Sequence, residues 1–145
     1  MAVRIGRDEL KARLRAASPA VLPSLLACDF ANMEREVRAV EEAGAPALHL
    51  DVMDGHFVPN ISIGVPIVQA VRRITALPLD VHLMISNPAD YVEPFRKAGA
   101  DSMTIHIEAV PDPRPLLDKI RSLGALAGIS LALIVPPSMP DQSHE

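Results

Sequence analysis

Cysteine is almost absent from this sequence of 145 residues, in which Cys28 is the single one. One thiol cannot form an intramolecular disulfide, and such low cysteine use is consistent with a reducing compartment.

Basic tracts are missing as well: 14 lysines and arginines stand against 18 aspartates and glutamates, for a net charge of −4. A protein of this charge lacks the positive field that attracts phosphate backbones, so we expect no nucleic-acid partner.

Apolar runs long enough to cross a bilayer are also absent, so we expect no membrane partner. The first residues, MAVRIGRDELKARLRAAS, lack the apolar centre of a secretion signal, and their Asp8 and Glu9 argue against an organelle transit peptide. We therefore expect a cytoplasmic protein. Residues 1–19 are predicted to form a basic helical extension, and residues 20–145 a single domain, because a chain that is 49% hydrophobic can bury a real core.

From Ala20 onward, short apolar runs alternate with stretches in which apolar residues recur at three- and four-residue spacing. This alternation predicts a parallel sheet whose strands are connected by helices. Glycines such as Gly44, Gly99 and Gly124 mark the points where helices stop. The predicted strands are 21–26, 47–52, 79–84, 102–107 and 127–135, and the predicted helices are 32–43, 65–74, 88–98 and 113–123.

Two architectures fit this order of elements, a doubly wound sheet and a (β/α) barrel of the TIM type. A dinucleotide-binding sheet needs a glycine-rich turn after its first strand, and the corresponding loop, ACDFANM, has no glycine. The barrel is therefore favoured. A complete barrel takes roughly 200 to 250 residues, whereas this sequence supplies about four βα units and a fifth strand, so we expect an incomplete barrel.

Two histidines and an aspartate interrupt strands that are otherwise apolar. His49 and Asp51 stand two residues apart in LHLDV, so their side chains share one face of a strand. His82 lies near the end of the next strand, and the ends of neighbouring barrel strands converge. Two imidazoles and a carboxylate suit zinc, iron or manganese. A histidine at a strand end is more often a hydrogen-bonded structural residue, and the pattern alone leaves both alternatives open.

Other polar side chains are weaker candidates. His106 and Glu108 repeat the alternate spacing on the fourth strand, where His106 suits a pocket lining as well as a metal site. Asp54 and His56 fall in a loop whose Asp-Gly pair is ordinary turn chemistry. We interpret Asp80 as a structural residue.

Four long motifs in the sequence, PSLLACDF, HLDVMDGHFVPNISIG, LPLDVHLMISNP and AGADSMTIHIEA, resemble the successive signatures of the ribulose-phosphate 3-epimerase family. The resemblance runs from Pro23 to Leu131. Motifs of this length in the correct order are far more specific than one short pattern. Barrel isomerases of the tryptophan pathway share the architecture, but they do not predict His-x-Asp and Val-His-Leu-Met on consecutive strands.

The resemblance implies a barrel of the ribulose-phosphate-binding kind and an isomerase of the pentose phosphate pathway. Such an enzyme interconverts ribulose 5-phosphate and xylulose 5-phosphate by removing and returning a proton at C3 through an enediolate. Its ligand would be a small-molecule sugar phosphate. Its cofactor would be one divalent metal ion, namely Zn, Fe, Mn or Co.

The resemblance also assigns roles to individual residues. His49, Asp51 and His82 would be metal ligands, and Asp51 would in addition be one of the two acid–base carboxylates. The methionines would belong to a cap over the reacting carbon atoms. The residues in contact with substrate would be Ser24, His82, Met53 and Met84.

The resemblance weakens after Leu131, where ALIVPPSMPDQSHE replaces the Asn-Pro-containing turn of the family. The later strands of the family would carry the second catalytic aspartate and the glycine-rich loops that hold the substrate phosphate. We therefore expect unpaired strand edges and exposed apolar surface, which a homo-oligomer would cover. The alternative to an active epimerase is a truncated, catalytically inactive metal-binding or assembly fragment of that family.

Overall fold

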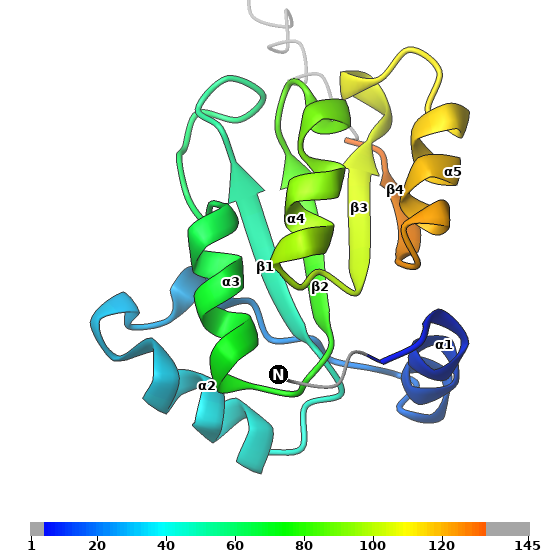
Figure 1. The fold of residues 1–145 in the computed structure, drawn as a ribbon. Helices are drawn as coiled ribbons and strands as arrows, with labels where there is room; N and C mark the ends of the chain where they lie inside the picture. Colours follow the sequence, from blue (N-terminus) through cyan, green and yellow to red (C-terminus); the bar gives the residue numbers. More distant parts are fainter. Residues whose placement is uncertain (1–4, 133–145) are drawn as a thin grey trace, which may run out of the picture.

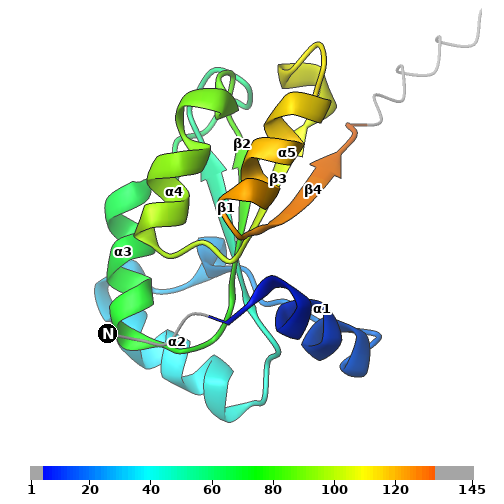
Figure 2. The ribbon, with the colours of Figure 1, turned by 45° about the vertical axis from the view of Figure 1, so that its right-hand side comes forward.

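The structure, a computed structural model, describes residues 5–132 and is built around one parallel sheet. Three helices connect its strands and lie together on one face (Figures 1 and 2). This confirms the predicted α/β architecture as an arc that does not close into a barrel. In sheet order, the four strands are β1 (Leu48–Met53), β2 (Leu79–Met84), β3 (Ser102–His106) and β4 (Leu126–Ser130). The connecting helices are α3 (Val65–Ile74), α4 (Val92–Ala98) and α5 (Arg114–Ser122).

The remaining elements precede the sheet or sit in its loops. Helix α1 lies near the end of the sheet at which the strands begin, away from the arrowheads (Figure 1). No helix within residues 5–132 combines the length and the apolar character that a membrane span requires. These elements are α1 (Arg7–Ala16), η1 (Leu25–Ala27), η2 (Phe30–Asn32), α2 (Met33–Glu42), η3 (Pro88–Asp90) and η4 (Ile107–Ala109).

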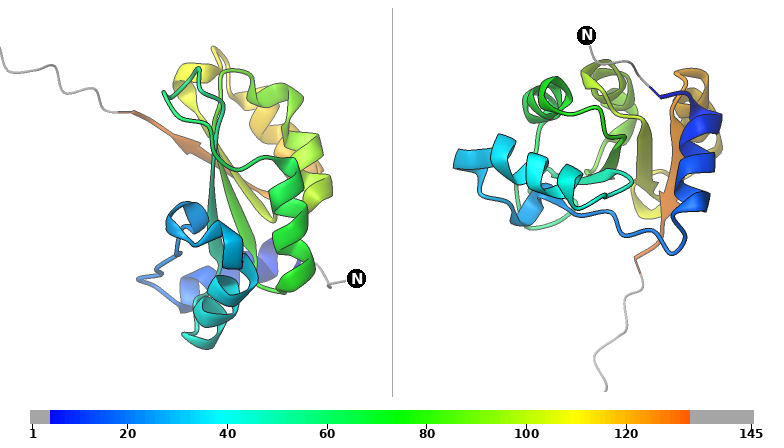
Figure 3. Two further views of the ribbon diagram at one scale, coloured as in Figure 1. Left: turned by 90° about the vertical axis from the view of Figure 1, so that its left-hand side faces the viewer. Right: turned by 90° about the horizontal axis from the view of Figure 1, so that it is seen from below.

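The two faces of the sheet differ in character. Along β1, Leu48, Leu50 and Val52 are buried, whereas the alternate residues His49, Asp51 and Met53 are only partly buried, and β2 repeats the pattern. The buried set packs against the connecting helices, whereas the other face is left open along much of the strands (Figure 3). The apolar core therefore lies between sheet and helices, and the open face carries the polar residues. Core residues include Val81, Ile105, Val68, Phe95 and Ile120.

A buried carboxylate ties the helices to the sheet. Asp101, whose side chain is 1% exposed, accepts hydrogen bonds from Arg72 at 3.0 Å and Arg96 at 3.3 Å. Its Oδ2 also accepts the backbone N–H of Leu79 at 3.1 Å. Because Arg72 belongs to α3 and Arg96 to α4, this cluster fixes both helices at the start of β2.

The predicted strand at 21–26 is wrong. In its place, Ser24 forms a single bridge to His49, and the chain turns at once into η1. Pro23 has no N–H to give to a sheet ladder, and the Ser24 hydroxyl accepts the N–H of Leu26 at 3.1 Å, which starts the turn. One carbonyl, that of Pro23, still accepts the N–H of His49 at 2.9 Å.

Two further predictions need correction. The helix predicted at 88–98 is divided into η3 and α4, because an unbroken helix would place Pro94 in its interior, where the ring meets a carbonyl of the preceding turn. In α4, Pro94 falls in the first turn, where no N–H is required. The strand predicted at 127–135 is observed as β4, which ends at Ser130, and positions 133–135 lie outside the described residues.

Candidate metal centre

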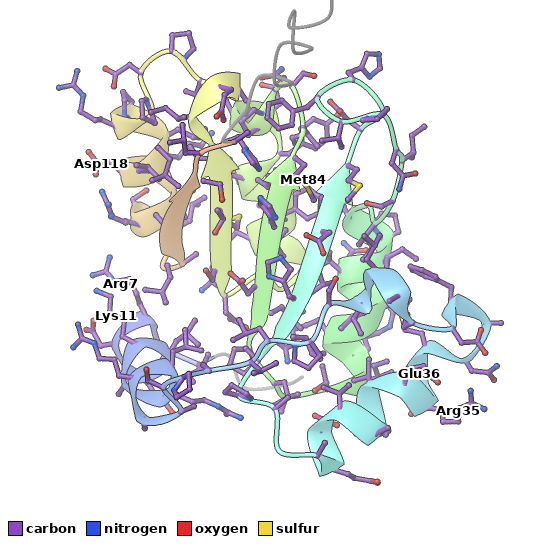
Figure 4. All side chains as sticks on the ribbon, turned by 180° about the vertical axis from the view of Figure 1, so that it is seen from behind. Arg7, Lys11, Arg35, Glu36, Met84 and Asp118 are labelled. Carbon is purple, nitrogen blue, oxygen red and sulfur yellow. The ribbon has the colours of Figure 1, made fainter. Side chains whose placement is uncertain are left out.

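The register of β1 and β2 gathers four polar side chains on the open face of the sheet. His49 is paired with Asp80, and Asp51 with His82. Each of these residues is two positions from the other on its own strand, so all four project from the same face. Figure 4 views the molecule from this side. The pairing of adjacent parallel strands therefore converts two separate sequence motifs into one cluster.

Three of these side chains could hold a metal ion. The ligand atoms of His49, Asp51 and His82 all lie within 4.8 Å of one another. Asp51 Oδ1 is 3.1 Å from His49 Nε2 and 3.3 Å from His82 Nδ1. Atoms bound to a common zinc at about 2.0–2.2 Å stand roughly 3 to 3.5 Å apart, so these separations suit a shared ion. Two nitrogen donors and one oxygen donor form a chemically reasonable set for such a metal.

Ser24 holds the other oxygen of Asp51. Its hydroxyl donates to Asp51 Oδ2 at 2.6 Å, across 27 positions of sequence. Burial acts to raise the pKa of Asp51, but the hydrogen bond from Ser24 and the interactions with His49 and His82 together lower that pKa below its usual value. Asp51 is therefore an ionised carboxylate that turns one oxygen to Ser24 and the other to the imidazoles.

Asp80 is the site residue that sequence analysis missed. Its Oδ2 lies 2.8 Å from His49 Nδ1, on the side of the ring away from Asp51. This hydrogen bond raises the pKa of His49 above its ordinary value, against the opposing effect of burial. The two-residue spacing between Asp80 and His82 was the available signal, since it places both on one face, but the contact with His49 depends on strand register.

His82 has an outer partner as well. Its Nε2 is 2.8 Å from Nε2 of His106 on β3, and the two rings are stacked with centroids 4.9 Å apart. Burial lowers the pKa of His82, and the proximity of His106 lowers it further. On its far side, His106 Nδ1 lies 3.4 Å from Glu108 Oε2. His106 therefore contacts His82 but is not one of the three residues that could share a metal ion.

The two predicted cap methionines lie side by side. Met53 and Met84 are the last residues of β1 and β2, are paired in register, and share the face of Asp51 and His82. Figure 4 shows Met84 at the upper end of its strand, next to β1. Apolar sulfur side chains therefore border the cluster at the end where parallel strands of a barrel carry their sites.

The loop after β1 is anchored by its aspartate. Asp54 Oδ1 accepts the N–H groups of His56 at 2.9 Å and Phe57 at 2.8 Å, and its Oδ2 accepts the N–H of Ser86 at 2.8 Å. The Ser86 hydrogen bond is the largest cause of a pKa for Asp54 far below its usual value. The turn predicted from Asp-Gly therefore also connects the loops that follow β1 and β2, through the hydrogen bond between Asp54 and Ser86.

A cavity of about 540 Å³ opens beside these loops. Its lining comes largely from the loops that follow β1 and β2, including Asp54, Ser62 and Ser86, together with the apolar Val52 and Phe95. His49, Asp51 and His82 do not line it. The cluster on the open face of the sheet therefore lies outside this cavity, although the neighbouring Met53 is part of the cavity lining.

Comparison with known proteins agrees with the motifs. The profile of the Ribulose-phosphate 3 epimerase family matches residues 20–143. The chain is 52% identical over 111 residues to ribulose-phosphate 3-epimerase from Bacillus subtilis (strain 168), which covers 77% of this chain and 51% of that protein. It is 48% identical over 117 residues to the cytoplasmic isoform from Oryza sativa subsp. japonica, with 80% and 51% covered. For the Treponema pallidum (strain Nichols) enzyme the identity is 50% over 118 residues, with 81% and 52% covered.

The chain spans about half the length of the curated relatives it matches. The match nevertheless extends over most of this chain, and it includes every strand of the described sheet. The chain therefore belongs to the ribulose-phosphate 3-epimerase family.

Proposed function

We propose that this chain carries the metal-binding half of a ribulose-phosphate 3-epimerase site, at which ribulose 5-phosphate and xylulose 5-phosphate are interconverted. The observation that supports it most directly is the approach of His49 Nε2 and His82 Nδ1 to a single oxygen of Asp51, at 3.1 Å and 3.3 Å. This cluster occurs in a chain whose relatives bear the name of that activity.

Asp51 is the proposed base on one side of the substrate. Epimerisation at C3 removes a proton from a carbon next to a carbonyl group, and an ionised carboxylate within reach can accept it. The lowered pKa of Asp51, which burial opposes but the Ser24 hydrogen bond and both histidines favour, keeps the group deprotonated before the step. Return of a proton to the opposite face of the enediolate inverts the configuration, and this requires a second acid.

His49, Asp51 and His82 are the proposed ligands of one divalent ion, namely zinc, iron, manganese or cobalt. Nitrogen and oxygen donors suit all four metals. When bound, the ion supplies positive charge that stabilises negative charge developing on the oxygens of the substrate. His82 is also a proposed substrate contact, because its side chain projects from the open face of the sheet beside Asp51.

The remaining substrate contacts proposed are Ser24, Met53 and Met84. Ser24 offers a hydroxyl that already bonds Asp51, so it lies beside the proposed base. The two methionines have no exchangeable proton, and they can cover a planar intermediate without competing for the transferred proton. Their adjacent positions at the ends of β1 and β2 support this role.

An inactive metal-binding or assembly fragment is the second candidate function, and a specific observation favours it. Among residues 5–132, the carboxylates at the cluster are Asp51 and Asp80, which come from adjacent strands. Both therefore approach from one side, and neither is an acid for the opposite face of a substrate. We propose that pairing of two copies into a homo-oligomer is one means to provide an acid on the opposite face of the substrate.

The ligand proposed is a small-molecule sugar phosphate, and the location proposed is the cytoplasm. The names of the relatives support the first, and the designation of the rice relative as a cytoplasmic isoform supports the second.

Zinc titration by calorimetry and an epimerase assay on the same purified chain test these proposals together. An active epimerase binds about one equivalent of metal and turns over ribulose 5-phosphate, whereas the fragment binds metal without turnover. His56→Gln is the matched control, because His56 is exposed and lies outside the cluster. Absence of zinc binding by the unmodified chain would contradict both candidates.

A further inference from the structure

Asp80 makes a contact that the proposed roles leave unexplained. Its Oδ2 lies 2.8 Å from His49 Nδ1, and its side chain is 19% exposed. Within residues 5–132, the Asp80 side chain forms its hydrogen bond with one other side chain, that of His49. Both residues are fixed by the ladder between β1 and β2, in which they are directly paired. The contact is therefore built into the sheet and does not depend on a mobile loop.

The chemistry of the contact favours a proton on Nδ1 of His49. A neutral imidazole has one N–H and one lone pair, and an ionised carboxylate can only accept. The ring is flanked by two carboxylates, Asp80 at Nδ1 and Asp51 at Nε2, with separations of 2.8 Å and 3.1 Å. Asp51 already accepts the Ser24 hydroxyl, so Asp80 is the closer and less occupied acceptor. A proton on Nδ1 leaves the lone pair of Nε2 directed at the cluster.

We propose that Asp80 is a positioning residue that holds His49 in the Nδ1–H tautomer and in the ring orientation that presents Nε2 to a cation. Carboxylates that receive the outer N–H of a ligating histidine fix its tautomer and increase its basicity, and their loss typically weakens metal affinity about 10- to 100-fold. The role in metal affinity depends on the proposed function. The tautomer does not, because it is argued from the closer approach of Asp80 to Nδ1 than of Asp51 to Nε2.

A purely structural role for Asp80 leads to different behaviour. In that case, its removal would lower stability without changing the proton position on His49 or the affinity for metal. The two roles are distinguished by a spectroscopic measurement on the histidine ring. Asp80→Asn keeps the shape and an acceptor oxygen but loses the charge, whereas Asp80→Ala loses both. Asp112→Asn is the matched control, since Asp112 is exposed and bonds only Arg114 among the described side chains.

The experiment uses the full 145-residue chain, labelled with ¹⁵N at its five histidines. His49→Gln identifies the His49 ring signals. Spectra are recorded without metal at a pH of about 9, where an ordinary imidazole is neutral. The expected result is an Nδ1–H ring in the unmodified chain and in Asp112→Asn, and a shift toward Nε2–H in Asp80→Ala. Zinc affinity is then measured by calorimetry, with an expected loss of about 10- to 100-fold in Asp80→Ala and a smaller loss in Asp80→Asn.

The outcomes separate this inference from the proposed function. An unchanged His49 tautomer, or a zinc affinity in Asp80→Ala within about twofold of the unmodified chain, overturns the positioning role. A chain that fails to bind zinc but shows the tautomer shift supports the hydrogen-bonding role of Asp80 and contradicts the proposed metal site. If Asp80→Ala does not fold, Asp80→Asn still decides the question. The positioning role requires the zinc affinity of Asp80→Asn to fall by more than that of Asp112→Asn, and an equal change in the two variants overturns it.

Discussion

Asp51 and His82 face each other across β1 and β2, with Oδ1 of the carboxylate 3.3 Å from Nδ1 of the imidazole. Their strands are joined by α3 and its loops, so the contact spans 31 positions of sequence. The same oxygen of Asp51 also faces His49. One carboxylate oxygen thus links the motifs of two strands, and the proposed site depends on it.

Substitution of Asp51 by asparagine tests that dependence. Asp51→Asn keeps the size of the side chain but removes the negative charge and the proposed base. We expect epimerase turnover, where the unmodified chain shows it, to fall by about 10²- to 10⁴-fold. Zinc affinity should fall as well, because an anionic ligand becomes a neutral amide. Rates and calorimetric titrations measure both effects. Asp118→Asn, on the exposed surface of α5, is the control and should match the unmodified chain.

The charge of Asp54 should make the stability of the folded chain depend on pH. The Ser86, His56 and Phe57 N–H groups favour the ionised form and hold the pKa of Asp54 below its value in an unfolded chain. Because the unfolded state binds the proton more readily, this contribution is complete above the unfolded pKa of about 3.9 and is lost as pH falls through the folded pKa.

The measurement is urea denaturation of the unmodified chain and of Asp54→Asn at a series of pH values. We expect Asp54→Asn to be the less stable protein near neutral pH, and the difference to shrink as the pH falls below about 4. A difference in unfolding free energy that stays constant over this range would show that the charge of Asp54 is not involved.

Gly99 should not tolerate a side chain. It follows α4 with φ of +129°, and a Cβ built there would lie 2.6 Å from Cγ of Arg72. Arg72 is itself held by Asp101, so it cannot simply move away. We expect Gly99→Ala to lower the unfolding free energy by more than about 1 kcal/mol. Gly6→Ala, where nothing lies within 4 Å, is the control. Equal urea midpoints for the two variants would contradict the described backbone.

Phe95 should be a principal core residue. It lies on α4 with 2% of its surface exposed and packs in the layer between helices and sheet. We expect Phe95→Ala to cost about 3–5 kcal/mol of unfolding free energy, because it leaves a cavity in that layer. Phe30, which is 49% exposed, supplies the control Phe30→Ala. Chemical denaturation of both variants measures the change in unfolding free energy. A similar small decrease in both would show that Phe95 is not a principal core residue.

Sequence patterns predicted two elements with both ends at the observed residue. The helix at 65–74 and the strand at 79–84 are observed with those bounds. Both have continuous apolar periodicity and clear ends, so local information was sufficient. Two of the errors fell at prolines: Pro23 prevented the expected first strand, and Pro94 divided an expected helix. At Pro23 the missing N–H, and at Pro94 the clash of the ring with a carbonyl of the preceding turn, prevailed over an apolar pattern that otherwise continued.

The sequence by itself determined that His49 and Asp51 share a face, because strand side chains alternate with a period of two, and the motifs determined the family. Only the tertiary structure decided which residues meet across strands. The positions of Ser24 against Asp51 and of Asp80 against His49 depend on the register between segments 27 to 31 positions apart. Register is fixed by burial of the opposite face against the helices, a property of the assembled core that no short stretch of sequence contains.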